Sequence, residues 1–408
     1  MKAPSNEFWP AMVEKAYAKF YGSYGAIEGG HCSEAMVDFT GGVVERYKLR
    51  DPPMKLFSII LKALKRRSLI SVAVNRSNAT DGVRRRKGII SGHAYSLTAA
   101  RIINAGSKKE VKIVRVKNPW SNEIEWNGRF SDKSIEWQFI SKEIQRELKL
   151  QFEDDGEFFM IFNDFLENFD HIEFCHVSPG QLVLEDEGKQ WFLTSLEEMF
   201  NAEDNFFPQI VVKLVDPDEH DDDDYCTLVL SLMQLNCRNT GLEHSAVGFD
   251  IYKLNDDDFN QTFLNREFFT TRKLVGSNKF EHFREICVRF RLVPGYYVII
   301  PKTLTYASRK FMLRIFTESM IQSEHSKIIV KVNKKPQNLK NETRIEMFTE
   351  EFTPTAASAA PQSPRSPSMM KICFWWWASI VFTVVTMFVV SACFIIYFDK
   401  GSISLRHF

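Results

Sequence analysis

Residues 87–120 read KGIISGHAYSLTAARIINAGSKKEVKIVRVKNPW, and this stretch decides the fold class of the first half of the chain. Apolar and polar residues alternate clearly over 111–116 and weakly over 94–104, which indicates two β-strands. His93 stands at the head of the first strand and Asn118 at the end of the second. Adjacent antiparallel strands would bring these two side chains close together.

His93 and Asn118 are a pair that suits proton transfer. Imidazole has an unperturbed pKa close to neutrality, so histidine is the usual proton acceptor for a thiol or hydroxyl nucleophile. An asparagine amide can bond one ring nitrogen and fix the tautomer that leaves the other nitrogen as the base. Trp120 would then cover the pair and exclude water. A single histidine in an alternating apolar segment is more often structural, so this pair alone does not establish an active site.

The sequence around the pair resembles the calpain family of calcium-dependent cysteine proteases. The resemblance is carried by Gly-His-Ala-Tyr-Ser at 92–96, Lys-Asn-Pro-Trp at 117–120, Glu-Phe-Trp-Pro-Ala at 7–11, Gly-Ser-Tyr at 22–24, Asp-Phe-Thr-Gly-Gly at 38–42 and Asp-Gly-Glu-Phe at 155–158. It implies an α+β fold with the antiparallel sheet of the second papain-like subdomain of the calpain core. It also implies catalytic roles for His93 and Asn118, with Trp120 as the active-site shield, and protein or peptide substrates.

The catalytic nucleophile of the calpain pattern is missing. Calpains carry it in a Gln-x-x-x-Gly-x-Cys-Trp segment, and none of the seven cysteines here stands in such a segment. Cys32, in Gly-Gly-His-Cys-Ser-Glu, is a weak substitute. We therefore expect a truncated cysteine endopeptidase that is inactive by itself, with a further chain as the possible source of the Cys subdomain. The alternative is a catalytically inactive, membrane-tethered calpain-like binding or regulatory protein.

Calcium is the cofactor that the resemblance implies. Ca²⁺ takes six to eight oxygen ligands, many of them carboxylates. The matching ligands in the calpain pattern are the side chains of Glu125, Asp132, Asp155 and Glu157 and the backbone carbonyl of Glu153. The sequence contains no EF-hand loop. The acidic tract 216–224 could bind a cation or a basic surface, and a solvated loop is an equally good interpretation.

The chain divides into five predicted parts. They are a partial protease core at 1–180, with helices over 8–20 and 54–64, an all-β sandwich at 181–320, a Ser/Pro/Ala-rich linker at 321–371, a transmembrane helix at 372–398 and a polar tail at 399–408. Short β segments separated by turns such as Val293-Pro294-Gly295 indicate the sandwich, which the resemblance identifies as the C2-like domain of calpains. The uncharged segment 372–398 opens with three tryptophans and is long enough to cross a bilayer.

Composition narrows the classes of partner and compartment. Fifty-two basic residues balance 52 acidic residues, so non-specific nucleic-acid binding is not expected. The cysteines show no paired spacing, and no secretory signal opens the sequence, which favours a reducing compartment. Because the apolar segment lies so near the C-terminus, we expect a tail-anchor-like single span with cytosolic domains. Basic residues flank both ends of this segment and do not by themselves set its orientation.

Overall fold

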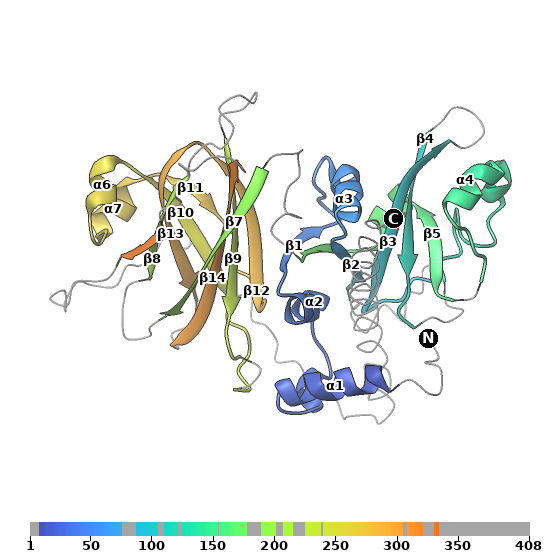
Figure 1. Cartoon of the computed structure of the whole chain (residues 1–408), viewed down its shortest axis with the longest axis horizontal. Helices are drawn as coiled ribbons and strands as arrows, with labels where there is room; N and C mark the ends of the chain where they lie inside the picture. The colour runs from blue at the N-terminus through green and yellow to red at the C-terminus, as the bar shows by residue number, and fades with distance from the viewer. Residues whose placement is uncertain are drawn as a thin grey trace, which may run out of the picture. The chain divides into compact units, whose positions relative to one another are not determined.

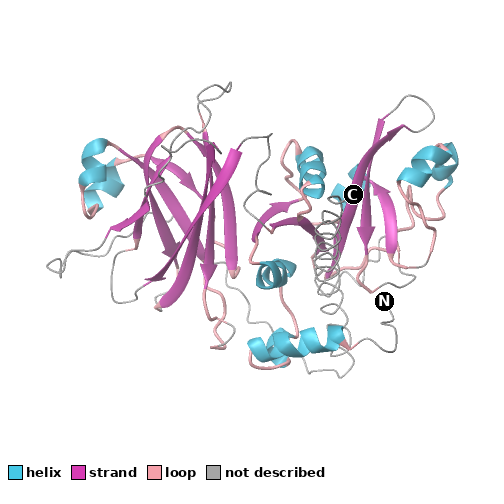
Figure 2. Ribbon diagram, viewed as in Figure 1, coloured by secondary structure: helices cyan, strands magenta, loops and turns pink. Residues whose placement is uncertain are grey.

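The computed structural model describes residues 8–75, 87–104, 110–120, 125–153, 155–177, 189–200, 207–214, 225–237, 240–304, 308–320 and 330–333. These residues form two compact units, which divide after Val177 (Figure 1). The first unit mixes helices with one sheet, and the second consists mainly of strands (Figure 2).

The first unit is built on one antiparallel six-stranded sheet. Its strand order is β1-β6-β2-β3-β4-β5. The strands are β1 (Val43–Lys48), β2 (Leu69–Val74), β3 (His93–Asn104), β4 (Glu110–Lys117), β5 (Glu157–Ile161) and β6 (His171–His176). The helices are α1 (Trp9–Phe20), α2 (Cys32–Thr40), α3 (Leu56–Lys65), α4 (Lys142–Glu147) and α5 (Phe162–Asn168), with 3₁₀ helices η1 (Gly25–Ile27) and η2 (Ile135–Phe139). The predicted antiparallel sheet is confirmed.

The main core of this unit lies between one face of the sheet and helix α3. Leu56, Phe57 and Ile60 of α3 pack with Val72 of β2 and Tyr95 of β3. Full burial of an aliphatic or aromatic side chain of this size stabilises the fold by roughly 2 kcal/mol. The sequence alternation therefore sets which side of each strand enters this core.

The opposite face of the sheet carries polar groups. Arg46 of β1 forms an ion pair with Glu173 of β6, and its Nε donates to Glu173 Oε1 at 2.8 Å. Ser71 of β2 donates to the same carboxylate at 3.0 Å. These residues are cross-strand neighbours in the ladder, so this face is polar at β1, β6 and β2. At β4 and β5 the same face carries Ile113 and Phe159, which form a second apolar cluster with Trp137.

The apolar spacing of helix α1 does not predict which of its faces packs against the rest of the unit. Phe8, Met12 and Phe20 share one face by spacing, and they are 74%, 68% and 65% exposed. The residues that contact the rest of the unit are Tyr17 and Tyr21, whose hydroxyls donate to Asp38 Oδ2 at 2.6 and 2.5 Å. The predicted helix is confirmed, but the apolar face that the spacing marks lies exposed in this structure.

The second unit is an antiparallel β-sandwich, as predicted. One sheet has the order β11-β10-β13-β8-β15 and the other β12-β9-β14-β7. The strands are β7 (Lys189–Phe200), β8 (Gln209–Leu214), β9 (Cys226–Gln234), β10 (Val247–Leu254), β11 (Leu274–Ser277), β12 (Glu285–Leu292), β13 (Gly295–Thr303), β14 (Arg309–Met320) and β15 (Val330–Asn333). Two short helices that we did not predict, α6 (Asp256–Asn260) and α7 (Arg266–Thr271), lie between β10 and β11.

Strand β15 lies within the range predicted as a linker. Val330–Asn333 pairs antiparallel with β8, and Val330 stands opposite Val212. The alternating Val-Lys-Val sequence gives this short segment a strand pattern despite its polar surroundings. The sandwich therefore includes residues beyond 320.

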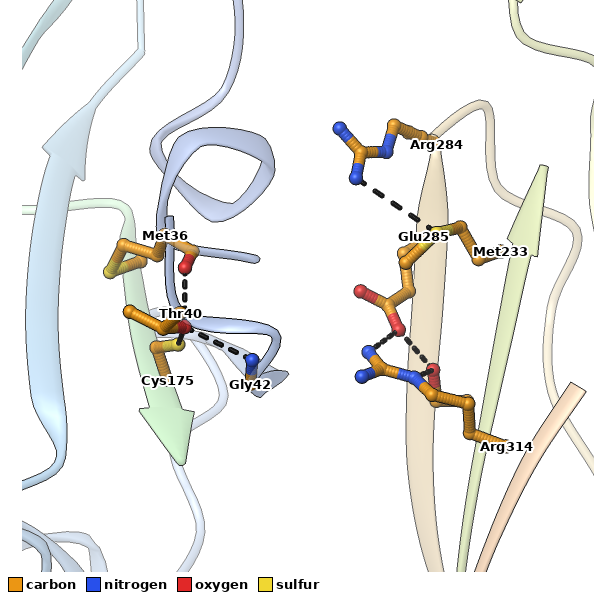
Figure 3. A network of polar contacts seen from close by, with 9 residues as sticks. Met36, Thr40, Gly42, Cys175, Met233, Arg284, Glu285 and Arg314 are labelled. Carbon is orange, nitrogen blue, oxygen red and sulfur yellow. Dashed lines mark hydrogen bonds and ion pairs between the residues drawn. The ribbon is translucent and has the colours of Figure 1, made fainter. Parts of the chain in front are cut away.

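Figure 3 shows one polar network at the C-terminal end of α2 and another between strands of the sandwich. Helix α2 ends at Gly41, whose φ of +67° suits glycine, and Thr40 Oγ1 donates to the Met36 carbonyl at 2.5 Å. In the sandwich, the guanidinium of Arg314 on β14 binds the carboxylate of Glu285 on β12.

The structure describes no helix with the length and apolarity needed to cross a membrane. The predicted membrane segment 372–398 and the polar tail 399–408 lie outside the described residues. The acidic tract 216–224 and most of the predicted linker also lie outside the described residues.

Candidate active site

The structure brings His93 and Asn118 together at one end of two neighbouring strands. His93 is the first residue of β3, and Asn118 directly follows β4. His93 Nε2 lies 2.9 Å from Asn118 Oδ1. The side chains are buried, since His93 is 4% exposed and Asn118 0%. The antiparallel register of β3 and β4, in which Ser96 stands opposite Lys117, explains why residues so far apart in sequence meet.

Backbone contacts hold the asparagine in place. Its side-chain Oδ1 also accepts from the Trp120 backbone N–H at 3.1 Å, and its own N–H donates to the Gly156 carbonyl at 2.7 Å. An amide oxygen that faces Nε2 requires the imidazole proton on that nitrogen. The lone pair of the neutral ring therefore resides on Nδ1, which is the tautomer that a base needs.

Two aromatic rings cover the imidazole. The Trp120 ring centre lies 4.3 Å from that of His93, with 44° between the ring planes. Tyr95 meets the imidazole edge-on at 4.9 Å, and its hydroxyl accepts from the Ile90 N–H at 2.9 Å. This arrangement fits the shielding role predicted for Trp120, because the rings keep water from the His–Asn hydrogen bond.

Two glycines shape the turn that leads into the histidine. Gly92 has a φ of +68°, and its N–H donates to the Asn75 carbonyl at 3.2 Å. Gly88 has a φ of +87°, and a Cβ at this position would lie 1.7 Å from the Glu125 carbonyl oxygen. Only glycine fits at Gly88, so the chain before His93 can pass directly against the loop that contains Glu125.

Burial controls the protonation of the site. It lowers the pKa of His93 from 6.5 to about 4, although the hydrogen bond with Asn118 acts in the opposite direction. The imidazole is therefore neutral at pH 7 and able to accept a proton. A positive charge formed there during a reaction needs a compensating negative group, such as a thiolate.

Comparison with known proteins identifies both units. Residues 1–176 match the family model described as calpain family cysteine protease, and residues 199–316 match the model described as calpain large subunit, domain III. The chain belongs to the calpain family. The second unit is therefore calpain domain III, and the first unit belongs to the protease core.

Curated calpains align with most of this chain. Calpain-A of Drosophila melanogaster is 40% identical over 344 residues, which cover 79% of this chain and 42% of that protein. Calpain-9 of Mus musculus is 39% identical over 335 residues, covering 78% and 47%. The calpain-1 catalytic subunit of Bos taurus is 36% identical over 371 residues, covering 84% and 51%. The chain thus spans about half or less of the length of these calpains.

Cys32 does not face the calpain His–Asn pair. Its side chain contacts Ser71, and burial together with the neighbouring Glu173 carboxylate raises the pKa of its thiol. His93 stands opposite Val74 in the ladder, on the face of the sheet that holds Val72. Side chains alternate along a strand, so Ser71 and Cys32 lie on the opposite face. Cys32 and His93 therefore lie on opposite faces of the same sheet.

The predicted calcium ligands lie in two neighbouring loops. Glu125 Oε1 accepts from the Gly156 N–H at 2.7 Å, and Asp155 Oδ1 accepts from the Glu157 N–H at 2.9 Å. Asp155 also pairs with Lys117 at 3.5 Å, and Glu157 with Arg115 at 3.5 Å. Among the described residues, which include Asp132 and Glu153, no three acidic, histidine or cysteine side chains gather closely enough to hold a metal.

Some of the predicted calcium ligands are placed where they could bind Ca²⁺, and one is held elsewhere. Carboxylates and a backbone carbonyl on adjacent loops are the oxygen ligands that this cation prefers. Glu125 accepts from the Gly156 N–H and Asp155 directly precedes Gly156, so both carboxylates belong to neighbouring loops and fit such a site. Glu157 points instead toward Arg115 and Thr98, and it would have to leave them to join the same ligand set.

A second His–Asn pair lies in the same calpain unit and was not predicted. His171 Nε2 is 3.0 Å from Asn75 Oδ1. His171 stands opposite Ala73 on the sheet face away from His93, and it is less buried than His93. Its signal in the sequence was weak because Asn75, which directly follows β2, lies far from His171 in the chain and has no flanking calpain motif.

The titration of His93 should be visible in the stability of the fold. Because its pKa falls from 6.5 to about 4 on folding, the unfolded chain binds more protons between these pH values. Stability attributable to His93 is therefore complete above pH 6.5 and falls as the pH drops toward 4, by about 3 kcal/mol in total. We expect His93→Gln to remove this part of the pH dependence in urea unfolding followed by tryptophan fluorescence. Identical slopes for the two proteins would contradict a buried neutral imidazole.

Proposed function

We propose that the chain provides the His–Asn half of a calcium-dependent, calpain-type cysteine endopeptidase for limited intracellular proteolysis. The observation that carries this proposal is the 2.9 Å contact between His93 Nε2 and Asn118 Oδ1 beneath the Trp120 ring. The nucleophile comes from a Cys-bearing subdomain outside these 408 residues. Intact proteins or peptides are the substrates.

The chemistry of this half-site follows from its geometry. His93 Nδ1 accepts the thiol proton, and the resulting thiolate attacks the peptide carbonyl carbon. The imidazolium then returns its proton to the leaving amine as the peptide C–N bond breaks and an acyl-enzyme remains. Water, deprotonated by the same imidazole, releases the acyl group and restores the thiol. Asn118 keeps the ring in one orientation throughout, and Trp120 limits access of water.

The exposed apolar side chains at α1 offer a contact surface for the proposed Cys-bearing subdomain. Phe8, Met12 and Phe20 recur at multiples of four residues and are all more than half exposed. Large apolar side chains that gather on one helix face indicate an interaction surface. We propose that the Cys-bearing subdomain covers this face in the complete enzyme.

Calcium would be held by Glu125, Asp132, Asp155 and Glu157, with the carbonyl of Glu153. When bound, it supplies a divalent charge that neutralises these carboxylates. Gly156 links the ligand loops to the catalytic pair, because its N–H donates to Glu125 and its carbonyl accepts from the Asn118 N–H. An ordered ligand loop therefore holds the backbone of Asn118.

We further propose that residues 372–398 anchor the enzyme in a membrane, with the two units on the cytosolic side. This proposal rests on the length and uncharged character of that segment in the sequence. Anchorage would confine proteolysis to substrates at or near the membrane surface.

Complementation tests the proposed activity. The purified chain should show no calcium-dependent cleavage of casein. Addition of a recombinant calpain subdomain that carries the Gln-x-x-x-Gly-x-Cys-Trp segment should produce cleavage that requires calcium and stops with a thiol-blocking inhibitor. Cleavage by the chain alone would mean that its own cysteines include the nucleophile.

The same experiment addresses the alternative function. The absence of a Cys-Trp segment from the sequence favours a catalytically inactive, membrane-tethered binding or regulatory protein. In that case the chain and the Cys-bearing subdomain would form a stable complex with no cleavage at any calcium concentration. That result would refute the protease proposal and support the alternative.

A further inference from the structure

Helix α4 lies beyond the β5 edge of the first unit's sheet (Figure 1). Residues of this helix and of the segment that follows it line a basic pocket. Its volume is ≈ 430 Å³, and its lining includes Lys142, Arg146 and Lys149 together with Phe152. The other lining residues are Gln145, Leu150 and Gln151, so no carboxylate contributes to it. Lys142 and Arg146 are four residues apart and share one face of the helix. The pocket is therefore a local concentration of positive charge.

The acidic residues of the same segment are directed elsewhere. Glu143 and Glu147 lie on α4 but do not line the pocket, and Glu136 accepts from Ser134. Glu153 follows Phe152 and is also absent from the lining. Residues 133–153 contain four basic and four acidic residues, yet three of the basic and none of the acidic side chains line the pocket.

Exposed apolar side chains continue this basic surface. Ile135 and Phe139 of η2 are 64% and 63% exposed, and Phe152 is 52% exposed. Phe152 connects the pocket to η2, because its ring centre lies 6.1 Å from that of Trp137. We call Ile135, Phe139, Lys142, Arg146, Lys149 and Phe152 together the η2–α4 surface.

The base of this surface is rigidly held. Trp137 is buried in a cluster with Phe130, Leu148 and Phe159, and its Nε1 donates to the Ser131 carbonyl at 2.9 Å. The Gln145 amide donates to the Trp137 and Ile140 carbonyls at 2.8 and 2.9 Å. The exposed side chains thus project from a fixed platform, which reduces the entropy lost when they bind a partner.

We propose that the η2–α4 surface docks onto the anionic headgroups of a phospholipid bilayer. Lysine and arginine side chains are attracted to anionic lipid, and exposed Phe and Ile side chains insert at the boundary between headgroups and acyl chains. A bilayer is favoured over an acidic peptide because large apolar groups lie beside the cations. The proposed membrane segment of the same chain also keeps a bilayer within reach, and only this reason rests on the proposed function.

Amide hydrogen exchange on the full chain tests this docking at the surface itself. The chain is incubated with vesicles of phosphatidylcholine alone, or with vesicles in which roughly a third of the lipid is phosphatidylserine. We expect exchange in residues 133–153 to slow at least about fivefold on the anionic vesicles only, since each cation near such a surface strengthens association about fivefold. Equal exchange on both vesicles would overturn the proposal.

Matched variants separate the η2–α4 surface from general charge effects. Lys142→Glu with Arg146→Glu should abolish the protection, whereas Lys62→Glu with Lys65→Glu on α3, an equal change in net charge, should leave it intact. Phe139→Ser should weaken it, and Met54→Ser, at a side chain that is 100% exposed, should not. Loss of protection in both charge variants alike would refute a specific surface.

Two further measurements distinguish a bilayer from an acidic peptide as the partner, and the docking surface from the proposed membrane anchor. Soluble polyglutamate that protects residues 133–153 as well as anionic vesicles do would replace the bilayer with an acidic peptide and overturn the docking proposal. Protection of residues 372–398 on both types of vesicle reports membrane insertion independently. Failure of docking is thus distinguishable from failure of the proposed anchor, and neither readout requires proteolysis.

Discussion

Replacement of His93 by alanine is expected to lower kcat/KM of the complemented protease by about 10⁴-fold or more. In the proposed mechanism the imidazole takes the thiol proton. Asn118 Oδ1 holds the ring at 2.9 Å from His93 Nε2 and also accepts from the Trp120 N–H. Alanine removes both the base and the ion-pair partner of the thiolate. Initial rates of casein cleavage at saturating calcium, with equal amounts of the Cys-bearing subdomain, measure the loss.

His171→Ala is the matched control for this variant. His171 also bonds an asparagine side chain, at 3.0 Å from Asn75 Oδ1, but it lies on the other face of the sheet. We expect its replacement to leave the cleavage rate within about threefold of the unchanged protein, as for a substitution outside the site. An equal loss in both variants would show that the His93 effect reflects folding, and full activity of His93→Ala would refute its role as the base.

Asp250→Ala should destabilise the sandwich by about 3–5 kcal/mol, because it leaves a lysine buried without its counter-charge. Asp250 on β10 and Lys302 on β13 form an ion pair at 2.6 Å, with side chains only 8% and 11% exposed. The Lys302 ammonium also lies 5.1 Å from the centre of the Phe280 ring, which cannot replace a carboxylate. Urea unfolding followed by circular dichroism measures the change in the free energy of unfolding.

A double variant provides the control for the sandwich. Asp250→Leu with Lys302→Met replaces both charges by apolar groups of similar size, and such replacements of a buried pair are often neutral or stabilising. We therefore expect it to recover most of the stability lost in Asp250→Ala. A loss below about 1 kcal/mol in the single variant would mean that water reaches Lys302.

The contact between His93 and Asn118 could be predicted from the sequence because it involves the ends of two adjacent strands. Alternation over 111–116 indicates β4, and antiparallel pairing then forces Asn118 toward His93. The position of Trp120 follows from its place two residues later, where its N–H bonds the same amide oxygen. The motifs around these residues also predicted the calpain family correctly.

Features that depend on tertiary contacts could not be predicted as well from the sequence. The apolar spacing in α1 predicts a helix, but only the structure shows that Tyr17 and Tyr21 turn inward toward Asp38. Helix α6 carries a capping box in which Asn255 Oδ1 accepts from the Asp258 N–H at 2.7 Å, a signal that could have revealed it. The ion pair of Glu157 with Arg115 arises from the pairing of β4 with β5, which no spacing in one segment reveals.

Gly156 lies between the proposed calcium ligands and the His93–Asn118 pair. Its two backbone groups contact Glu125 on one side and Asn118 on the other. If cation binding at these carboxylates changes the affinity of the completed enzyme for a peptide inhibitor, the inhibitor must change the affinity for the cation by the same factor. Where calcium strengthens inhibitor binding, the inhibitor-bound enzyme would retain calcium at concentrations too low to load the free enzyme.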